Sequence, residues 1–180
     1  MLKTTITNIG TVVLAGLIGT PVGAQDVDFS GTWILDRDSS DIPQRRSRGF
    51  RGRRGGNGGG RQGGIGGGGP AATTISHTDG ELVMEVQLGD QSQKLTYRLD
   101  GSTSQNAGPR GGETSTISSW DDAALVTEGS QTVSTPRGEV VIEIQERRAL
   151  SNNGQTMTVS STRTTPRGEV KTTLVYRKSD

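Results

Sequence analysis

Seven arginines lie in the glycine-rich stretch 45–69, RRSRGFRGRRGGNGGGRQGGIGGGG. This tract is the densest group of side chains that could bind an anion. Each guanidinium can engage a phosphate, glycine lets the chain follow a polymer backbone, and Phe50 could stack on a base. The tract therefore suggests binding to an anionic polymer. The candidate binding residues are Arg45, Arg46, Arg48, Arg51, Arg53 and Arg54.

The rest of the chain argues against nucleic acid as that polymer. Of the 20 Lys and Arg residues, one lies in the first 24 residues and seven in the tract, so 12 remain against 19 Asp and Glu. This acidic remainder competes for the arginines. Lipopolysaccharide and acidic polysaccharide stay open as partners. A plain disordered connection, with too little apolar surface to order itself, is the other interpretation of segment 42–70.

Catalytic and zinc-binding signals are scarce. The chain has one histidine, His77, and no cysteine, so a zinc site built from protein ligands is not expected. No Gly-x-Ser-x-Gly elbow supplies a nucleophile beside His77. We therefore expect a non-enzymatic protein without a cofactor or a metal.

Clustered carboxylates are the remaining candidates for a metal or catalytic site. The segment 36–41, DRDSSD, offers oxygen ligands for Ca²⁺ but lacks the glycine and distal glutamate of a calcium loop, which favours a polar turn. Asp121-Asp122 and the pair Glu143 and Glu146 are the places where glycosidase-type carboxylates would be sought. Nothing in the sequence separates them from a solvated strand face.

The N-terminus predicts export. Lys3 is followed by the apolar run 9–18, and Val22-Gly23-Ala24 matches a cleavage site after residue 24. The run is shorter than the roughly 20 residues of a membrane span. We expect a secretory signal peptide over 1–24, with residues 25–180 forming one monomeric domain in the bacterial periplasm or outside the cell. Without cysteine, that domain must hold together by packing and hydrogen bonding alone.

Period-2 alternation of apolar residues predicts an all-β domain. Leu82, Met84 and Val86 share one face of a strand, and Leu95 and Tyr97 share one face of the next. Turn signals separate about nine such runs: 31–36, 73–78, 81–88, 93–99, 114–120, 124–133, 139–150, 155–164 and 169–178. Short connections imply an antiparallel up-and-down meander of about 8–9 strands, which avoids exposed edges by closing into a barrel.

A barrel of this size either fills with side chains or holds one small molecule. The sequence favours neither, because large aromatic residues are few. If a cavity exists, it would take a small apolar or amphipathic ligand. The residues predicted to line it are Leu95, Tyr97, Trp120 and Tyr176.

A repeated corner marks the turns. TPRGEV occurs at 135–140 and again at 165–170, and GPRGGE at 108–113 is similar. Proline at the second turn position and glycine at the fourth suit a tight hairpin. In a nine-strand meander these three corners fall at one end of the barrel. The connection 42–70 then falls at the other end, with the turns at Asp121-Asp122 and Asn152-Asn153.

Both ends of the expected domain resemble small secreted bacterial lipocalin-like (calycin-type) proteins. The opening FSGTWILDRDSSD contains Gly31-Thr32-Trp33, which is similar to the Gly-x-Trp of the first lipocalin strand, and the ending 156–178 is similar to their threonine-rich hairpins. The resemblance implies a barrel closed at one end by Trp33, with Arg177 packed across it and Gly31 in a structural role. It also implies that the first long connection acts as a lid, and it brings no established activity.

Overall fold

The computed structural model describes residues 27–42, 69–88, 91–108, 112–136 and 138–179. These residues form ten strands in one sheet, and every pairing is antiparallel. In chain order the strands are β1 (Gly31–Asp41), β2 (Ala72–His77), β3 (Glu81–Leu88), β4 (Gln91–Arg98), β5 (Thr103–Ala107), β6 (Glu113–Asp121), β7 (Ala124–Thr135), β8 (Gly138–Ser151), β9 (Thr156–Thr165) and β10 (Gly168–Ser179). No helix that could cross a membrane occurs in the described part of the chain.

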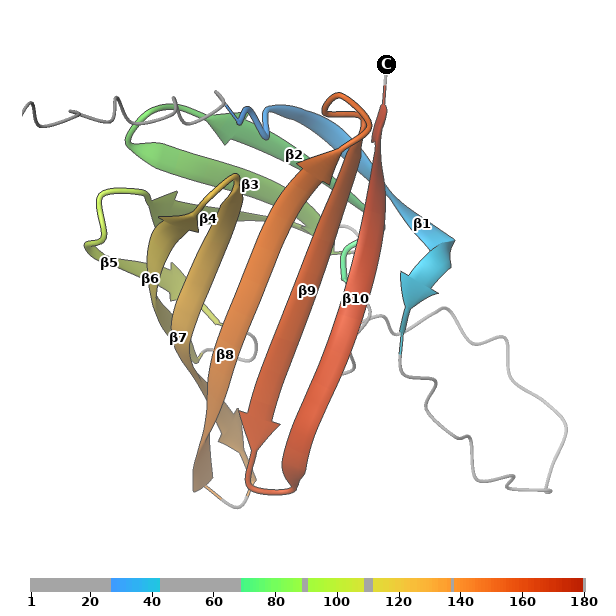
Figure 1. Ribbon diagram of the computed structural model, residues 1–180. Helices are drawn as coiled ribbons and strands as arrows, with labels where there is room; N and C mark the ends of the chain where they lie inside the picture. The colour runs from blue at the N-terminus through green and yellow to red at the C-terminus, as the bar shows by residue number, and fades with distance from the viewer. Residues whose placement is uncertain (1–26, 43–68, 89–90, 109–111, 137, 180) are drawn as a thin grey trace, which may run out of the picture.

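The sheet curls into a nearly closed barrel (Figure 1). The strand order is β4-β3-β2-β1-β10-β9-β8-β7-β6-β5, so β1 pairs with β10 and brings the two ends of the domain together. The predicted all-β, antiparallel, lipocalin-like fold is confirmed. There are ten strands rather than eight or nine, because Thr103–Ala107, expected to be loop, forms β5.

The seam between β4 and β5 is joined by side chains instead of a backbone ladder. Asn106 Oδ1 accepts a hydrogen bond from the Thr96 amide at 2.7 Å, and Asn106 Nδ2 donates to the Thr96 carbonyl at 2.9 Å. Two residues further along β4, the Arg98 amide donates to Ser104 Oγ at 2.7 Å. Asn106 and Ser104 thus satisfy edge groups that would otherwise lack partners.

The extra strand reverses the expected arrangement of the turns. Counting from β1, the turns at 136–137 and 166–167 lie at the same end of the barrel as the connection after β1, and the turns at 122–123 and 152–155 lie at the opposite end. The prediction that placed the Pro-Arg-Gly corners opposite the 42–70 connection is therefore wrong. Gly69 marks the first end, called the Gly69 end below, and Trp33 the other, called the Trp33 end.

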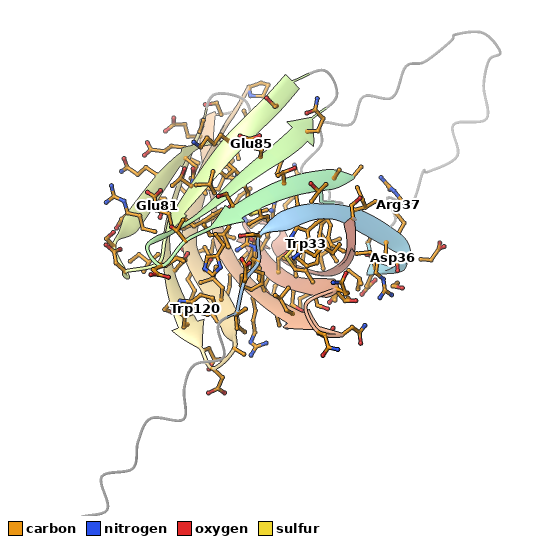
Figure 2. The ribbon with its side chains drawn as sticks, turned by 90° about the horizontal axis from the view of Figure 1, so that it is seen from above. Trp33, Asp36, Arg37, Glu81, Glu85 and Trp120 are labelled. Atoms are coloured by element: carbon orange, nitrogen blue, oxygen red, sulfur yellow. The ribbon has the colours of Figure 1, made fainter. Side chains whose placement is uncertain are left out.

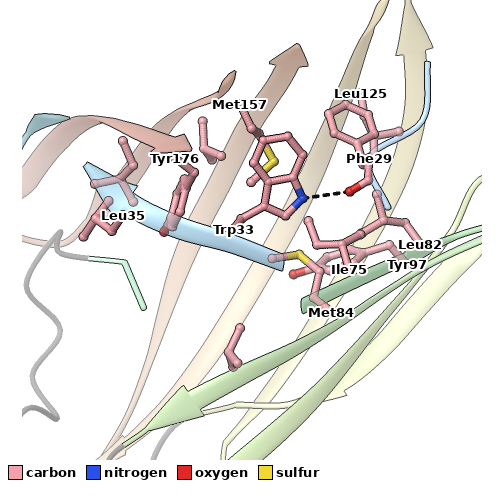
Figure 3. Close-up of a cluster of buried hydrophobic side chains, with 13 residues drawn as sticks. Phe29, Trp33, Leu35, Ile75, Leu82, Met84, Tyr97, Leu125, Met157 and Tyr176 are labelled. Carbon is pink, nitrogen blue, oxygen red and sulfur yellow. Dashed lines mark hydrogen bonds between the residues drawn. The ribbon is translucent and has the colours of Figure 1, made fainter. Parts of the chain in front are cut away.

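A compact apolar plug fills the Trp33 end. Trp33 is fully buried, and its indole Nε1 donates to the Phe29 carbonyl at 2.8 Å (Figure 3). Leu82, Leu125 and Met157 are completely buried around it. Seen along the barrel from above, Trp33 lies inside the ring of strands, whereas Glu81 and Glu85 lie on its periphery (Figure 2).

The cation over Trp33 is Lys178, not Arg177. Lys178 Nζ lies 5.6 Å from the ring centroid of Trp33, close enough for a cation–π contact. Gly31 leaves room for this side chain: its φ is +130°, and a Cβ there would lie 2.6 Å from Lys178 Cε. Arg177 was expected in this position, but successive residues of β10 face opposite sides of the sheet, so Arg177 points outward.

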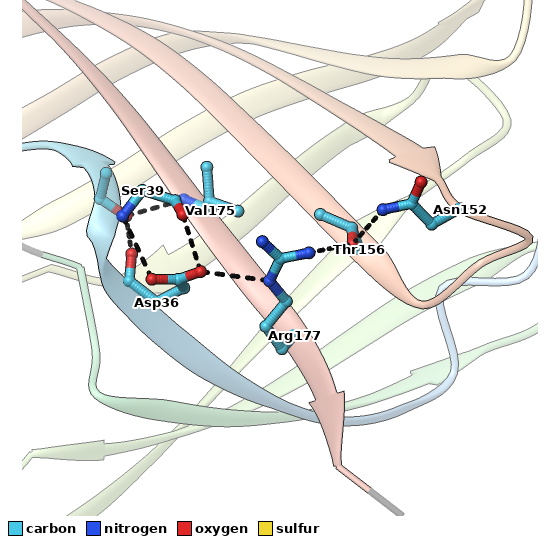
Figure 4. A network of polar contacts seen from close by, with 7 residues as sticks. Asp36, Ser39, Asn152, Thr156, Val175 and Arg177 are labelled. Atoms are coloured by element: carbon cyan, nitrogen blue, oxygen red, sulfur yellow. Dashed lines mark hydrogen bonds and ion pairs between the residues drawn. The ribbon is translucent and has the colours of Figure 1, made fainter.

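Arg177 instead links β10 to its neighbours β1 and β9 on the outer face of the barrel (Figure 4). Its Nε donates to Asp36 Oδ2 at 3.2 Å and its Nη1 donates to Thr156 Oγ1 at 2.9 Å. Hydrogen bonds from Ser39, together with Arg177, hold the pKa of Asp36 below its usual value. The DRDSSD segment is thus a bulge in β1, where Ser40 Oγ accepts from the Val175 amide at 2.9 Å in place of a regular ladder contact.

Candidate functional site

A cavity of about 240 Å³ lies inside the barrel, between the plug and the Gly69 end. Three of the four side chains predicted to line it do so: Leu95, Tyr97 and Tyr176. The same alternation that buries one face of each strand directs them inward. Further apolar lining comes from Met84, Val86, Ile144, Met157, Val159 and Leu174.

Trp120 was also predicted to line the cavity, and it does not. It lies two residues beyond the inward-facing Ser118 on β6, next to the turn at the Trp33 end. There it is 40% exposed and stacks on Phe29 with ring centroids 6.1 Å apart. Its position along the strand carries it past the plug, so it covers the closed end of the barrel from outside.

A buried arginine dominates the polar side of the cavity. Arg148, on β8, is 3% exposed and lines the cavity. Its Nη2 donates to Glu146 Oε2 at 2.6 Å, and its Nη1 donates to Thr127 Oγ1 at 3.3 Å. The guanidinium also lies 5.0 Å from the ring centroid of Tyr97 on β4, on the far side of the seam.

The polar contacts continue to both sides of Arg148. Glu146 Oε1 lies 3.7 Å from Nη2 of Arg163, whose side chain is 36% exposed. In the other direction, the hydroxyls of Thr127 and Ser118 are hydrogen-bonded at 2.9 Å. This chain of groups, here called the polar wall, runs from β6 to β9 and faces the apolar residues of β3 and β4.

Two buried polar atoms of this region lack a protein partner. They are Nε of Arg148 and Oγ1 of Thr116, and both residues line the cavity. A buried donor without an acceptor costs about 1–3 kcal/mol, and more where the group is charged. The cavity thus presents hydrogen-bonding capacity that a bound molecule or an ordered water would satisfy.

The two tyrosines of the cavity are held in their neutral form. Burial, with a smaller contribution from Glu146, raises the pKa of Tyr176 to about 12 against the opposing effect of Arg148. Burial likewise raises the pKa of Tyr97. For Arg148, burial favours the neutral form, but Glu146 and the tyrosines raise its pKa overall, so the guanidinium stays charged.

Two other hollows lie on the outer face of the barrel, over β5–β10. Their volumes are about 600 Å³ and 660 Å³, larger than the internal cavity. They are open to solvent and are lined mainly by the Ser, Thr and charged side chains that the polar face of any sheet presents. Volume alone therefore does not make them sites, and the cavity inside the barrel is the stronger candidate.

The residues considered for catalysis are spread over the barrel. His77 lies at the Trp33 end, where its Nδ1 accepts a 3.4 Å hydrogen bond from the Phe29 amide and lies 3.7 Å from Asp28. Asp121 is exposed and pairs with Arg147 at 3.4 Å. Of the pair on β8, Glu143 points outward, whereas Glu146 belongs to the polar wall. Within the described ranges, no group of three His, Asp or Glu side chains could hold a metal ion.

The six arginines proposed to bind anionic polymers, Arg45 to Arg54, lie outside the described residues. The same holds for the expected signal peptide at 1–24. Both remain predictions from the sequence.

No family model matches the sequence, and no curated protein matches it. Solved structures do match the fold. A REP1-NXSQ fatty acid transporter superimposes with a TM-score of 0.50 at 9% sequence identity, covering 84% of this chain and 96% of its own. The zebrafish ileal bile acid-binding protein, solved with cholic acid, gives a TM-score of 0.46 at 16% identity, covering 60% of this chain and 72% of its own. The chain shares the calycin-type barrel fold.

Proposed function

We propose that this protein is a non-enzymatic barrel that binds one small molecule in its interior, with the apolar part of the ligand against β3 and β4 and its polar end at the polar wall. The observation that carries the proposal is the pair of unsatisfied atoms, Arg148 Nε and Thr116 Oγ1, on residues that line a cavity with an apolar side and a polar side. Side chains that close-packed the interior would leave no such opening. A cavity with apolar lining and a few convergent polar groups is typical of ligand sites.

The size of the cavity favours a small ligand. Pockets for drug-sized molecules span about 300–1,000 Å³, and this one measures about 240 Å³. The fatty acid transporter has the same fold, which supports a binding role for the interior of the barrel. We therefore infer a ligand smaller than a long-chain lipid.

The proposal also includes export to the periplasm or the cell exterior and a monomeric state. Both rest on predictions from the sequence, namely the signal peptide over 1–24 and one domain over 25–180. The alternative function is that of an envelope protein whose Arg/Gly tract contacts lipopolysaccharide or polysaccharide and, less readily, nucleic acid. This alternative rests on composition alone. Retention on heparin that is unchanged after deletion of residues 45–69 would eliminate it.

Calorimetric titration of the mature protein with 1-octanol, 2-octanone and octanoate tests the binding proposal. At least one of these should bind, and Leu95→Trp, which fills the cavity, should abolish that binding. Lys94→Trp is the matched control, because Lys94 is exposed on the outer face of the same strand. Circular dichroism verifies that both variants fold, since overpacking costs about 1–3 kcal/mol. Failure of all three probes to bind would refute the proposal, as would equal binding by the two variants.

A further inference from the structure

We propose that Glu146 is a specificity-determining residue, which adapts the cavity to a ligand whose polar end is an uncharged hydrogen-bond acceptor, such as a ketone or ester carbonyl, and not a carboxylate. This inference rests on the proposed function. It concerns the charge state of the ligand, so its failure can be distinguished from failure of binding itself.

The first step is the charge at the deepest part of the polar wall. Arg148 is 3% exposed and Glu146 is 16% exposed, and they form an ion pair at 2.6 Å. Arg163 carries the remaining charge of the wall but is 36% exposed, so water screens it. Tyr97 and Tyr176 are neutral. Deep in the cavity, the charge of Arg148 is therefore already compensated by the protein.

The second step is the direction of the free donors. In a guanidinium, Nε and Nη2 lie along the same edge, and Glu146 occupies Nη2 of Arg148 while Nε is free. Any acceptor bound at Nε is therefore a close neighbour of the Glu146 carboxylate. A ligand carboxylate at this position would meet a like charge in a region of low dielectric, which disfavours it. A carbonyl oxygen would accept from Nε without that repulsion.

Thr116 supports the same ligand chemistry. Its hydroxyl is buried on β6 without a protein partner, and it can donate to an acceptor just as Arg148 Nε does. Each of these two donors can serve an uncharged acceptor oxygen, and neither brings an uncompensated positive charge that would call for a carboxylate. Thr127, which lies between the two strands, is already hydrogen-bonded to Arg148 and to Ser118, so it does not compete for the ligand.

The test compares 2-octanone with octanoate, which share chain length and differ in the charge of the polar end. At neutral pH the mature protein should bind 2-octanone at least roughly tenfold more tightly than octanoate. Glu146→Gln removes the negative charge and should raise the affinity for octanoate by roughly tenfold or more, with less than roughly threefold change for the ketone. Glu143→Gln, at an exposed outward position of the same strand, is the control and should leave both affinities unchanged.

A pH series on the unmodified protein keeps the test decisive if Glu146→Gln fails to fold. Binding of octanoate should strengthen as the pH falls through the carboxyl pKa of the ligand, while binding of 2-octanone stays constant. Glu146 faces Arg148, Arg163 and both tyrosines. In this acidic range the two arginines stay positively charged and the two tyrosines stay neutral. Tighter binding of octanoate than of 2-octanone at neutral pH, or its weakening on acidification, would overturn the role of Glu146 while leaving ligand binding established.

Discussion

Breaking the ion pair inside the barrel should destabilise the protein far more than breaking one outside it. Arg148→Met leaves the carboxylate of Glu146, which is 16% exposed, without its 2.6 Å partner. Removal of one member of a buried pair costs about 3–5 kcal/mol. Because Glu146 retains Arg163 at 3.7 Å, we expect the lower end, a loss of about 3 kcal/mol in the free energy of unfolding.

Arg147→Met is the matched control, one residue away on the opposite face of β8. Arg147 is 50% exposed and pairs with Asp121, itself 63% exposed, at 3.4 Å. Exposed pairs of this kind contribute less than about 1 kcal/mol. Urea unfolding followed by circular dichroism measures both variants, and a loss of about 3 kcal/mol corresponds to a fall of roughly 1–3 M in the midpoint.

The double variant Arg148→Met/Glu146→Leu separates the penalty of an unpaired charge from loss of packing. Replacing both members of a buried pair by apolar residues is often neutral or stabilising, so the double variant should recover to within about 1 kcal/mol of the wild type. The reasoning is refuted if Arg148→Met costs no more than Arg147→Met. It is equally refuted if the double variant is less stable than Arg148→Met alone.

Three further predictions concern the plug, the seam and the tyrosines. Trp33→Ala should lower the free energy of unfolding, measured by urea titration, by about 3–5 kcal/mol. Trp120→Ala, at a 40% exposed site, should lower it by less than half as much. Similar losses for the two variants would contradict the role of Trp33 in the plug. Asn106→Ala should cost about 1–3 kcal/mol and accelerate hydrogen exchange of the Thr96 amide, and unchanged exchange would show that the seam does not depend on this side chain. The pKa of Tyr176 is about 12 in the folded protein against 10.0 for the free side chain. The contribution of neutral Tyr176 to the free energy of unfolding is therefore complete below pH 10 and is lost as the pH rises to about 12. Over this pH range the wild type should lose about 3 kcal/mol more of its free energy of unfolding than Tyr176→Phe does, as measured by thermal or urea unfolding. Parallel dependence of stability on pH in the two proteins would disprove this prediction.

The apolar alternation was sufficient to predict most of the strands and the fold. Leu82, Met84 and Val86 on β3 and Leu95 and Tyr97 on β4 point inward as predicted. Their side chains are apolar because they face a plug or an apolar cavity wall, which is the situation in which a period-2 pattern is visible in a sequence.

Strand β5 could not be found in the same way. Its inward residues, Ser104 and Asn106, are polar because they hydrogen-bond to the backbone of β4 across the seam. Without an apolar face the segment looked like a loop. One missed strand then reversed the predicted end for every later turn, including the two TPRGEV corners.

The candidate site was predicted only on its apolar side. Trp120 shows that parity gives the face of a residue but not its depth along the barrel, since it lies beyond the plug. Arg148 was missed because a charged residue in a strand is ordinarily on the solvent face. A signal for Arg148 was nevertheless present in the sequence. Arg148 is spaced by even numbers of residues from Ile142, Ile144 and Glu146, so all four share the inward face of β8, which continues from two apolar residues into two residues of opposite charge.

Methyl-resolved NMR of the mature protein during titration with 2-octanone tests most directly whether the interior of the barrel is the binding site. Saturable shift changes should appear at the inward methyl groups of Val86, Leu95 and Leu174, which line the cavity. Val141, which is 55% exposed, should not shift. Changes confined to exposed methyl groups such as those of Val141, or no saturable change at the inward methyl groups, would contradict the account.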